Sequence, residues 1–278
     1  MLLKRLFVST GLDSTIAKLV HNTALKRLIP SPAYYSNQQR TITRAGVKYQ
    51  VQPHDLTQWL LFSGNTDNHV QAAIKHACPT GVILDIGANI GHFSLPVARS
   101  LKRRIIAFEP NPAIFKRLQN NLSLNPSLIP FVTLSPYGIG EKNEHKLLAM
   151  PTRNSGAGTL VENYDHEPHN NFTVEIKPLD DLINEPVAFI KIDVEGFEYF
   201  VLQGAERILR EYRPPIYFET NSLQPYQQSI FEKLKTYGYS LLLEQGKFFL
   251  PFDQKINLEG VHNVLAIATT SDILPSNA

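Results

Sequence analysis

The chain has 278 residues, of which 43% are hydrophobic and 19% are charged. This composition is typical of a folded protein with one large domain or two small ones, and it argues against a disordered chain. The net charge of +2 indicates no class of partner, and the single cysteine, Cys78, excludes an internal disulfide framework and a cysteine-based zinc cluster. Because the longest apolar runs are strand-sized, we predict no membrane span and no signal peptide, and we expect a cytoplasmic protein.

The first 50 residues form the most basic segment of the chain. They contain eight Lys and Arg residues and a single acid, Asp13. Apolar residues recur at helical spacing between Leu12 and Val20, so we predict a basic helical extension over residues 1–45. Two interpretations of this extension stay open. It is either a lid or docking arm for an anionic partner or a membrane surface, or a packed extension whose Lys and Arg side chains face water.

The rest of the chain, residues 46–278, is predicted to form one domain in which strands and helices alternate. Short apolar runs that are buried on both faces and separated by helices indicate an α/β fold with a mostly parallel, doubly wound sheet. Strands are expected at 47–51, 82–86, 104–109, 130–135, 189–193, 215–219, 241–245, 247–250 and 263–268. Helices are expected at 67–77, 91–100, 111–122, 197–212 and 231–237.

Residues 141–182 interrupt this alternation. Two strand-like pieces, HKLLAM and FTVEIKPL, lie on either side of a polar loop. We therefore predict a hairpin insertion in the domain. Asn154 and Ser155 lie in its polar loop, and loops at such edges often shape substrate sites.

The segment VILDIGANIGHF (residues 82–93) carries the strongest local signal. An apolar strand is followed by Gly87 and Gly91 and then by a helix, which allows the backbone to approach a ligand closely. The next strand ends in Glu109, at the place where an acid holds a ribose diol. Dinucleotide sites favour G-x-G-x-x-G, whereas here Asn89 replaces the middle glycine and Asp85 precedes the turn. An acid at residue 85 suits a ligand with a cationic ammonium, such as S-adenosylmethionine, better than it suits a ligand with an anionic pyrophosphate.

The segment KIDVEGFE (residues 191–198) places Asp193 and Glu195 at the carboxyl edge of the sheet, and Glu219 ends the next strand. Either acid could remove a proton from an acceptor hydroxyl, or the three could bind a divalent ion such as Mg²⁺. His92 is a further candidate base. The alternative is that Asp193 and Glu195 cap the following helix and that His92 is a polar residue of a first helical turn.

Three blocks of the sequence occur in the same order as in one known family. VILDIGANIGHFSL, IIAFEPNPAIFKRLQNNLSLN and IKIDVEGFEYFVLQGAERIL together resemble the FkbM-type S-adenosylmethionine-dependent methyltransferases, over roughly residues 46–220. The resemblance implies a class I methyltransferase (Rossmann-like) fold and S-adenosylmethionine as cofactor. It also implies O-methylation of a hydroxyl on a sugar, glycan or secondary metabolite.

The resemblance also assigns roles to residues. Contacts to the cofactor are implied for Asp85, Gly87, Ala88, Asn89, Gly91, Glu109, Asn111 and Glu141. Glu141 stands in a segment where the family reads A-L-S-D-K-x-G and this chain reads G-I-G-E-K, so its contact to adenine departs from the family pattern. Acceptor contacts are expected from Asn154, Ser155 and Glu219, and catalysis from Asp193, Glu195 or His92.

Two other functions stay open at this point. A nicotinamide-dependent oxidoreductase is disfavoured by the missing G-x-G-x-x-G and by the lack of a Tyr-x-x-x-Lys pair after a strand. A non-catalytic binding module is disfavoured by Asp193 and Glu195, which such a module need not keep. The expected partner is a small-molecule or glycan acceptor, with no nucleic acid and with peripheral membrane contact open for the basic N-terminus. The oligomeric state is not predicted.

Overall fold

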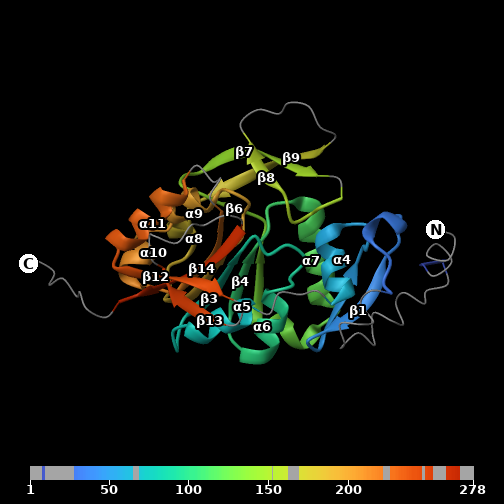
Figure 1. Cartoon of the computed structure of the whole chain (residues 1–278), viewed down its shortest axis with the longest axis horizontal. Coiled ribbons are helices and arrows are strands. Elements are labelled where there is room, and N and C mark those ends of the chain that lie inside the picture. The colour runs from blue at the N-terminus through green and yellow to red at the C-terminus, as the bar shows by residue number, and fades with distance from the viewer. Residues whose placement is uncertain are drawn as a thin grey trace, which may run out of the picture.

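The computed structural model describes residues 8–9, 28–64, 69–151, 153–161, 169–221, 226–245, 248–252 and 261–269 (Figure 1). Most of the predicted N-terminal helix, and the start of the helix predicted at 67–77, lie outside these residues. None of the helices in the described part of the chain combines the length and the apolarity needed to cross a bilayer.

The centre of the protein is an eight-stranded sheet in the order β13-β12-β14-β11-β10-β3-β4-β5. The pairs among β11, β10, β3, β4 and β5 are parallel, and the pairs that add β14, β12 and β13 are antiparallel. The chain builds β3, β4 and β5 towards one edge and then returns to β10 beside β3, so the strand order reverses there. The bounds are β3 (Val82–Ile86), β4 (Ile105–Phe108), β5 (Val132–Ser135), β10 (Val187–Ile192), β11 (Ile216–Asn221), β12 (Tyr239–Gln245), β13 (Phe248–Pro251) and β14 (Val261–Ala268).

Helices cover both faces of this sheet, which confirms the predicted doubly wound α/β fold. Successive side chains of a strand point to opposite faces, so Val82, Leu84 and Ile86 join one buried cluster while Ile83 joins the other. The first cluster packs against α8–α11, and the second against α4–α7. The helices are α4 (Leu56–Ser63), α5 (His69–Ala73), α6 (Ser94–Leu101), α7 (Pro112–Ser123), α8 (Leu179–Leu182), α9 (Glu198–Gln203), α10 (Glu206–Glu211) and α11 (Gln227–Thr236). Short 3-10 helices lie at Pro32–Tyr34, Ile74–His76 and Pro126–Phe131.

The single helix predicted over residues 197–212 is two helices, α9 and α10. The break lies at Gly204, whose amide donates to Phe200 at 3.1 Å and ends α9. A Cβ on Gly204 would collide with the carbonyl of Gly140. Glycine is therefore required by the close approach of the two backbones, and glycine is a poor residue for continuing a helix.

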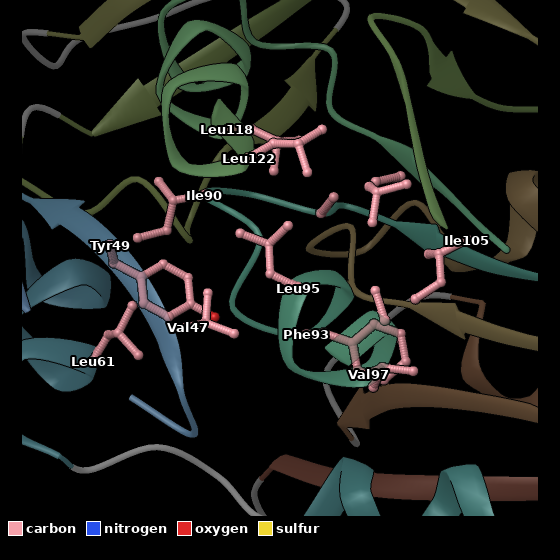
Figure 2. Packing of buried hydrophobic residues seen from close by; sticks show 14 of the residues in the cluster. Val47, Tyr49, Leu61, Ile90, Phe93, Leu95, Val97, Ile105, Leu118 and Leu122 are labelled. Atoms are coloured by element: carbon pink, nitrogen blue, oxygen red, sulfur yellow. The ribbon is translucent and has the colours of Figure 1, made fainter. Parts of the chain in front are cut away.

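The residues before the central sheet form a hairpin and a helix that pack on α7. Strand β1 (Arg40–Arg44) pairs antiparallel with β2 (Val47–Val51), so the predicted boundary between residues 45 and 46 falls in the turn that joins two paired strands. Figure 2 shows Val47 and Tyr49 of β2 and Leu61 of α4 among the buried side chains around Ile90. Four residues of the described part of the predicted extension, Val8, Ile29, Tyr35 and Ile42, are buried in the same cluster.

Two asparagines of the α7 region bind the backbone of β2. Asn121 Oδ1 accepts from the amide of Gln50 at 2.8 Å, and its Nδ2 donates to the carbonyl of Ile90 at 3.0 Å. Asn125 accepts from the amide of Lys48 at 2.9 Å and donates to its carbonyl at 2.8 Å. These amides replace a neighbouring strand along the edge of β2.

The insertion is larger than the predicted hairpin. Strands β7 (Glu144–Pro151) and β9 (His169–Lys177) form the expected antiparallel pair. A third strand, β8 (Thr159–Val161), comes from the loop and pairs with β7, and the short β6 (Gly138–Ile139) pairs with β9. The result is a four-stranded sheet in the order β6-β9-β7-β8, which Figure 1 shows above the central sheet at the top of the view.

Loss of the Asn121 amide is expected to destabilise the whole protein. Asn121→Ala would leave the buried amide of Gln50 and the carbonyl of Ile90 without this partner, at a cost of about 1–3 kcal/mol each. Asn120→Ala is the matched control, because the side chain of Asn120 is exposed. Urea unfolding should show a lower free energy of unfolding for Asn121→Ala alone. Equal values for the two variants would contradict the role given to Asn121.

Candidate active site

A cavity of about 310 Å³ lies at the carboxyl ends of β3, β4, β10 and β11, where the strand order reverses. Open α/β sheets bind their ligands at this place, and the volume is at the lower end of the range for small-molecule pockets. Three parts of the chain close it: the ends of the sheet strands, the insertion sheet and α4. Its lining residues are Thr57, Leu60, Ile86, Gly87, Asn89, His92, Phe108, Glu109, Pro110, Tyr137, Gly138, Ile139, Leu148, Met150, Ser155, Gly156, Gly158, Leu160, Asp193, Val194, Glu195, Phe197 and Glu219.

The glycine-rich turn after β3 forms one wall of the cavity. Gly87, Asn89 and Gly91 all have positive φ, at 79°, 50° and 89°. A Cβ on Gly87 would collide with the carbonyl oxygen of Asp193, so this glycine is required first by the close approach of the backbones that follow the paired strands β3 and β10. Gly91 and the buried Ala88 do not line the cavity. The helix predicted from residue 91 begins at Ser94, since the turn occupies the preceding residues.

Lys191 joins the two strands beneath the cavity. Its Nζ lies 3.2 Å from Asp85 Oδ1 and 3.2 Å from Asp193 Oδ2, and it donates to the carbonyl of Gly87 at 2.9 Å. Burial opposes its charge, but the carboxylates of Asp193 and Asp85 hold the pKa of Lys191 above its usual value. Asp85 is fully buried and also accepts from Ser94 Oγ at 2.5 Å, so it lies below the cavity and does not line it.

Sequence reasoning missed Lys191, although a signal was present. It is a charged residue inside VAFIKI, a strand whose six residues are all buried. A lysine in such a run needs a buried partner. Its partners here are Asp85 of the neighbouring strand β3 and Asp193, which directly follows β10.

Glu109 is held by the backbone on both sides. Its Oε2 accepts from the amide of Asn89 and its Oε1 from the amide of Asn111, both at 2.9 Å. Burial raises the pKa of Glu109 to about 7, although these two hydrogen bonds favour the ionised carboxylate. Asn111 itself caps α7 by accepting from the amides of Ala113 and Ile114, and it does not line the cavity.

The opposite end of the cavity is acidic. Asp193, Glu195 and Glu219 all line it. Burial, followed by repulsion from neighbouring carboxylates that include Asp193, raises the pKa of Glu195 and of Glu219 to about 7. Glu195 has a positive φ of 49°, a costly conformation for a residue with a side chain. Among the described residues, no group of three or more His, Cys, Asp or Glu side chains is arranged to hold a metal ion, so the predicted Mg²⁺ ligands do not form a metal site.

His92 also lines the cavity. Burial, followed by the positive charge of Lys191, lowers the pKa of His92 below its usual value. Its buried Nδ1 has no hydrogen-bond partner in the described part of the chain. A polar atom left in this state beside a cavity is available to a ligand.

The remaining predicted residues are divided between the cavity and its surroundings. Glu141 is exposed and does not line the cavity, whereas Tyr137, Gly138 and Ile139 do. Ser155 lines the cavity, but Asn154 does not. Asn154 instead accepts a hydrogen bond from Thr57 Oγ1 at 2.9 Å.

Apolar residues that the sequence did not single out form the remaining wall. Leu60 comes from α4, and Leu148, Met150 and Leu160 come from the insertion sheet. The sequence predicted the strand with Leu148 and Met150, but neither the helix with Leu60 nor the strand with Leu160. Nothing in the pattern indicates that these elements fold back over the carboxyl edge of the central sheet.

Comparison with known proteins identifies the family. The methyltransferase FkbM domain matches residues 85–241, which is more than half of the chain. The chain belongs to the FkbM methyltransferase family. The observed sheet, with β3 as its first parallel strand and an antiparallel β14 beside β11, is the Rossmann-like sheet expected of a class I methyltransferase.

Curated relatives of this FkbM-family chain include methyltransferases from distant organisms. Methyltransferase 1 of Beauveria bassiana is 30% identical over 45% of this chain and 58% of its own length. The hexuronic acid methyltransferase AglP of Haloferax volcanii is 28% identical over 51% of this chain and 56% of its own length. The chain thus spans little more than half of either relative. A crystal structure of methyltransferase FkbM from Methylobacillus flagellatus KT has a TM-score of 0.46 and 17% identity, covering 92% of this chain and 59% of that one.

Gly87→Ala is expected to destabilise the fold as well as the site. A positive φ alone costs about 1–3 kcal/mol for a residue with a side chain, and the collision with Asp193 adds to that cost. Gly196→Ala is the matched control, because Gly196 also has a positive φ, of 94°, and a Cβ there meets nothing within 4 Å. Thermal unfolding should therefore show a clearly larger decrease in melting temperature for Gly87→Ala than for Gly196→Ala. If Gly87→Ala stays as stable as the control, the close approach of residue 87 to the carbonyl of Asp193 tolerates a side chain.

Proposed function

We propose that the protein is an S-adenosylmethionine-dependent O-methyltransferase that methylates a hydroxyl of a small-molecule acceptor, such as a sugar, a glycan or a secondary metabolite. One observation carries the proposal: a cavity at the strand-order reversal has a backbone-held acid, Glu109, on one side and three carboxylates on the other. Membership of the FkbM family supports the methyltransferase class over a nicotinamide-dependent oxidoreductase.

The residues present fit S-adenosylmethionine. Glu109 would hold the ribose hydroxyls, since both of its oxygens are fixed at the end of β4. Phe108, Pro110 and Ile139 provide apolar surface for the base, and Asn89 and the turn around Gly87 would border the methionine part. When bound, the cofactor supplies an electrophilic methyl group on a sulfonium. No step through a metal ion is proposed.

Asp193 is the best-placed general base. Its side chain is 38% exposed towards the cavity, and Lys191 Nζ lies 3.2 Å from its Oδ2. The ammonium fixes one carboxylate oxygen, which leaves the other oxygen free to accept the proton of an acceptor hydroxyl. Positioning the hydroxyl for in-line attack is the other contribution that the protein can make.

The charge of the lining residues restricts the charge that the acceptor molecule can carry. Four carboxylates line the cavity (Glu109, Asp193, Glu195 and Glu219), whereas no lysine or arginine does so in the described part of the chain. An anionic acceptor would meet repulsion in a site of low dielectric. A neutral or amine-bearing acceptor is therefore favoured, which would set this protein apart from its relative named as a hexuronic acid methyltransferase.

Transfer of a labelled methyl group tests the proposal directly. Purified protein, S-adenosylmethionine with a labelled methyl group and a small-molecule extract of the source organism should yield labelled products. On ion exchange, those products should flow through or bind the cation exchanger. Label held on the anion exchanger would contradict the proposal that the acceptor is neutral or bears an amine. Calorimetric binding of the cofactor without any transfer would favour a binding module, and binding of NAD instead would favour an oxidoreductase.

Asp193→Asn should lower turnover by about 10²–10⁴-fold, the usual loss when a general base is removed, with little change in cofactor affinity. The amide keeps the shape of the side chain but cannot take up the proton. Asp181→Asn is a control, because the side chain of Asp181 is exposed and does not line the cavity. Steady-state kinetics and calorimetry on both variants separate turnover from binding. Near-normal turnover of Asp193→Asn would exclude Asp193 as the base.

A further inference from the structure

Asp55 makes hydrogen bonds to two parts of the chain that are far apart in sequence. It precedes α4, is 6% exposed and does not line the cavity. Its Oδ1 accepts from the amide of Gln58 at 3.0 Å, which caps α4. The same carboxylate accepts from Ser155 twice, from the amide at 2.7 Å and from Oγ at 2.9 Å.

Further contacts next to Asp55 join the first turn of α4 to the insertion loop. The amide of Leu56 donates to the carbonyl of Arg153 at 2.8 Å, and Thr57 Oγ1 donates to Asn154 Oδ1 at 2.9 Å. A Cβ on Gly156 would collide with Thr57 Oγ1, so the loop lies directly on α4. The first turn of α4 thus fixes residues 153–156 of the insertion, two of which line the cavity.

From Ser155 the hydrogen bonds continue to the acid of the site. The carbonyl of Ser155 accepts from Asn89 Nδ2 at 3.1 Å. The amide of Asn89 donates to Glu109 Oε2 at 2.9 Å. Asn89 has a positive φ of 50°, so its backbone orientation depends on such contacts. Asp55 is therefore connected to Glu109 through two intervening residues.

We propose that Asp55 is a positioning residue of the cofactor site. It holds Ser155, Ser155 orients Asn89, and the amide of Asn89 fixes the carboxylate of Glu109. The hairpin and α4 that precede the central sheet thereby complete a site whose binding residues lie elsewhere. The inference rests on the proposed function only in naming S-adenosylmethionine as the ligand, since the hydrogen bonds themselves need no ligand.

The hydrogen bonds at this position require a carboxylate. Three donors converge on its two oxygens, and each needs an acceptor. Serine is as good a helix cap as aspartate, but it is too short to reach Ser155 as well. Asp55→Ser therefore keeps the cap of α4 and removes the link to the loop. Asp55→Asn is the second variant, because its amide nitrogen would face a donor.

The test compares Asp55→Ser with Asp180→Ser. Asp180 is a matched control, since its carboxylate also accepts from backbone amides, those of Arg207 and Ile208, but lies outside the cavity. Calorimetric titration with S-adenosylhomocysteine should show a dissociation constant raised about tenfold for Asp55→Ser, the usual size for lost hydrogen bonds to a charged group, and unchanged for Asp180→Ser. Equal affinities of wild type and Asp55→Ser would overturn the proposal.

Two further measurements distinguish a failure of the positioning role from a failure of the proposed function. Without any ligand, amide hydrogen exchange at Ser155 and Asn89 should be faster in Asp55→Ser than in wild type, and unchanged exchange at Asn89 would also overturn the proposal. If wild type fails to bind S-adenosylhomocysteine while this difference persists, the proposed function fails and the positioning role stands. If Asp55→Ser does not fold, Asp55→Asn and Ser155→Ala are measured in the same way.

A double-mutant cycle tests the route through Asn89. Asn89→Gly removes the donation to Ser155 but tolerates the positive φ. If Asp55 acts through Asn89, the double variant Asp55→Ser with Asn89→Gly should bind S-adenosylhomocysteine no more weakly than Asn89→Gly alone. Additive losses would contradict this route.

Discussion

The site depends on one buried ammonium group, that of Lys191, between two strands at the reversal of the sheet order. It is 3% exposed and is surrounded by Asp85, Asp193 and the carbonyl of Gly87. A buried charge is costly unless it is paired and hydrogen-bonded, so these three groups can take few other arrangements. This arrangement places Asp193 at the cavity and brings the backbone of residue 87 against the carbonyl of Asp193, where only glycine fits.

The two sides of the cavity are built by different means. The side with Glu109 is fixed by backbone amides at the ends of adjacent parallel strands, which leaves little freedom in its position. The side with Glu195 and Glu219 consists of carboxylates that repel one another, with their pKa values raised to about 7. Under the proposed function, the rigid side would hold the cofactor, and the acidic side and the insertion would face the acceptor.

Elements outside the central sheet close the site. The insertion sheet supplies apolar side chains such as Leu148 and Met150, and α4 supplies Thr57 and Leu60. Buried polar groups anchor these elements to the rest of the chain. Asp55 joins α4 to the insertion loop, and Asn121 and Asn125 join β2 to α7. Buried polar networks of this kind specify one arrangement because any other leaves polar atoms unpaired.

The sequence by itself determined the parallel part of the sheet, the glycine turn and the acids Glu109, Asp193 and Glu219 at strand ends, since periodicity and turn chemistry are local. It did not determine that Asp85 lies beneath the cavity, that Glu141 lies outside it, or that Asp55 binds Ser155. Those outcomes depend on contacts between residues far apart in sequence, such as Asp55 and Ser155, which are 100 positions apart. Only the tertiary structure decides them, because a buried carboxylate takes whichever donors the packed elements bring within reach.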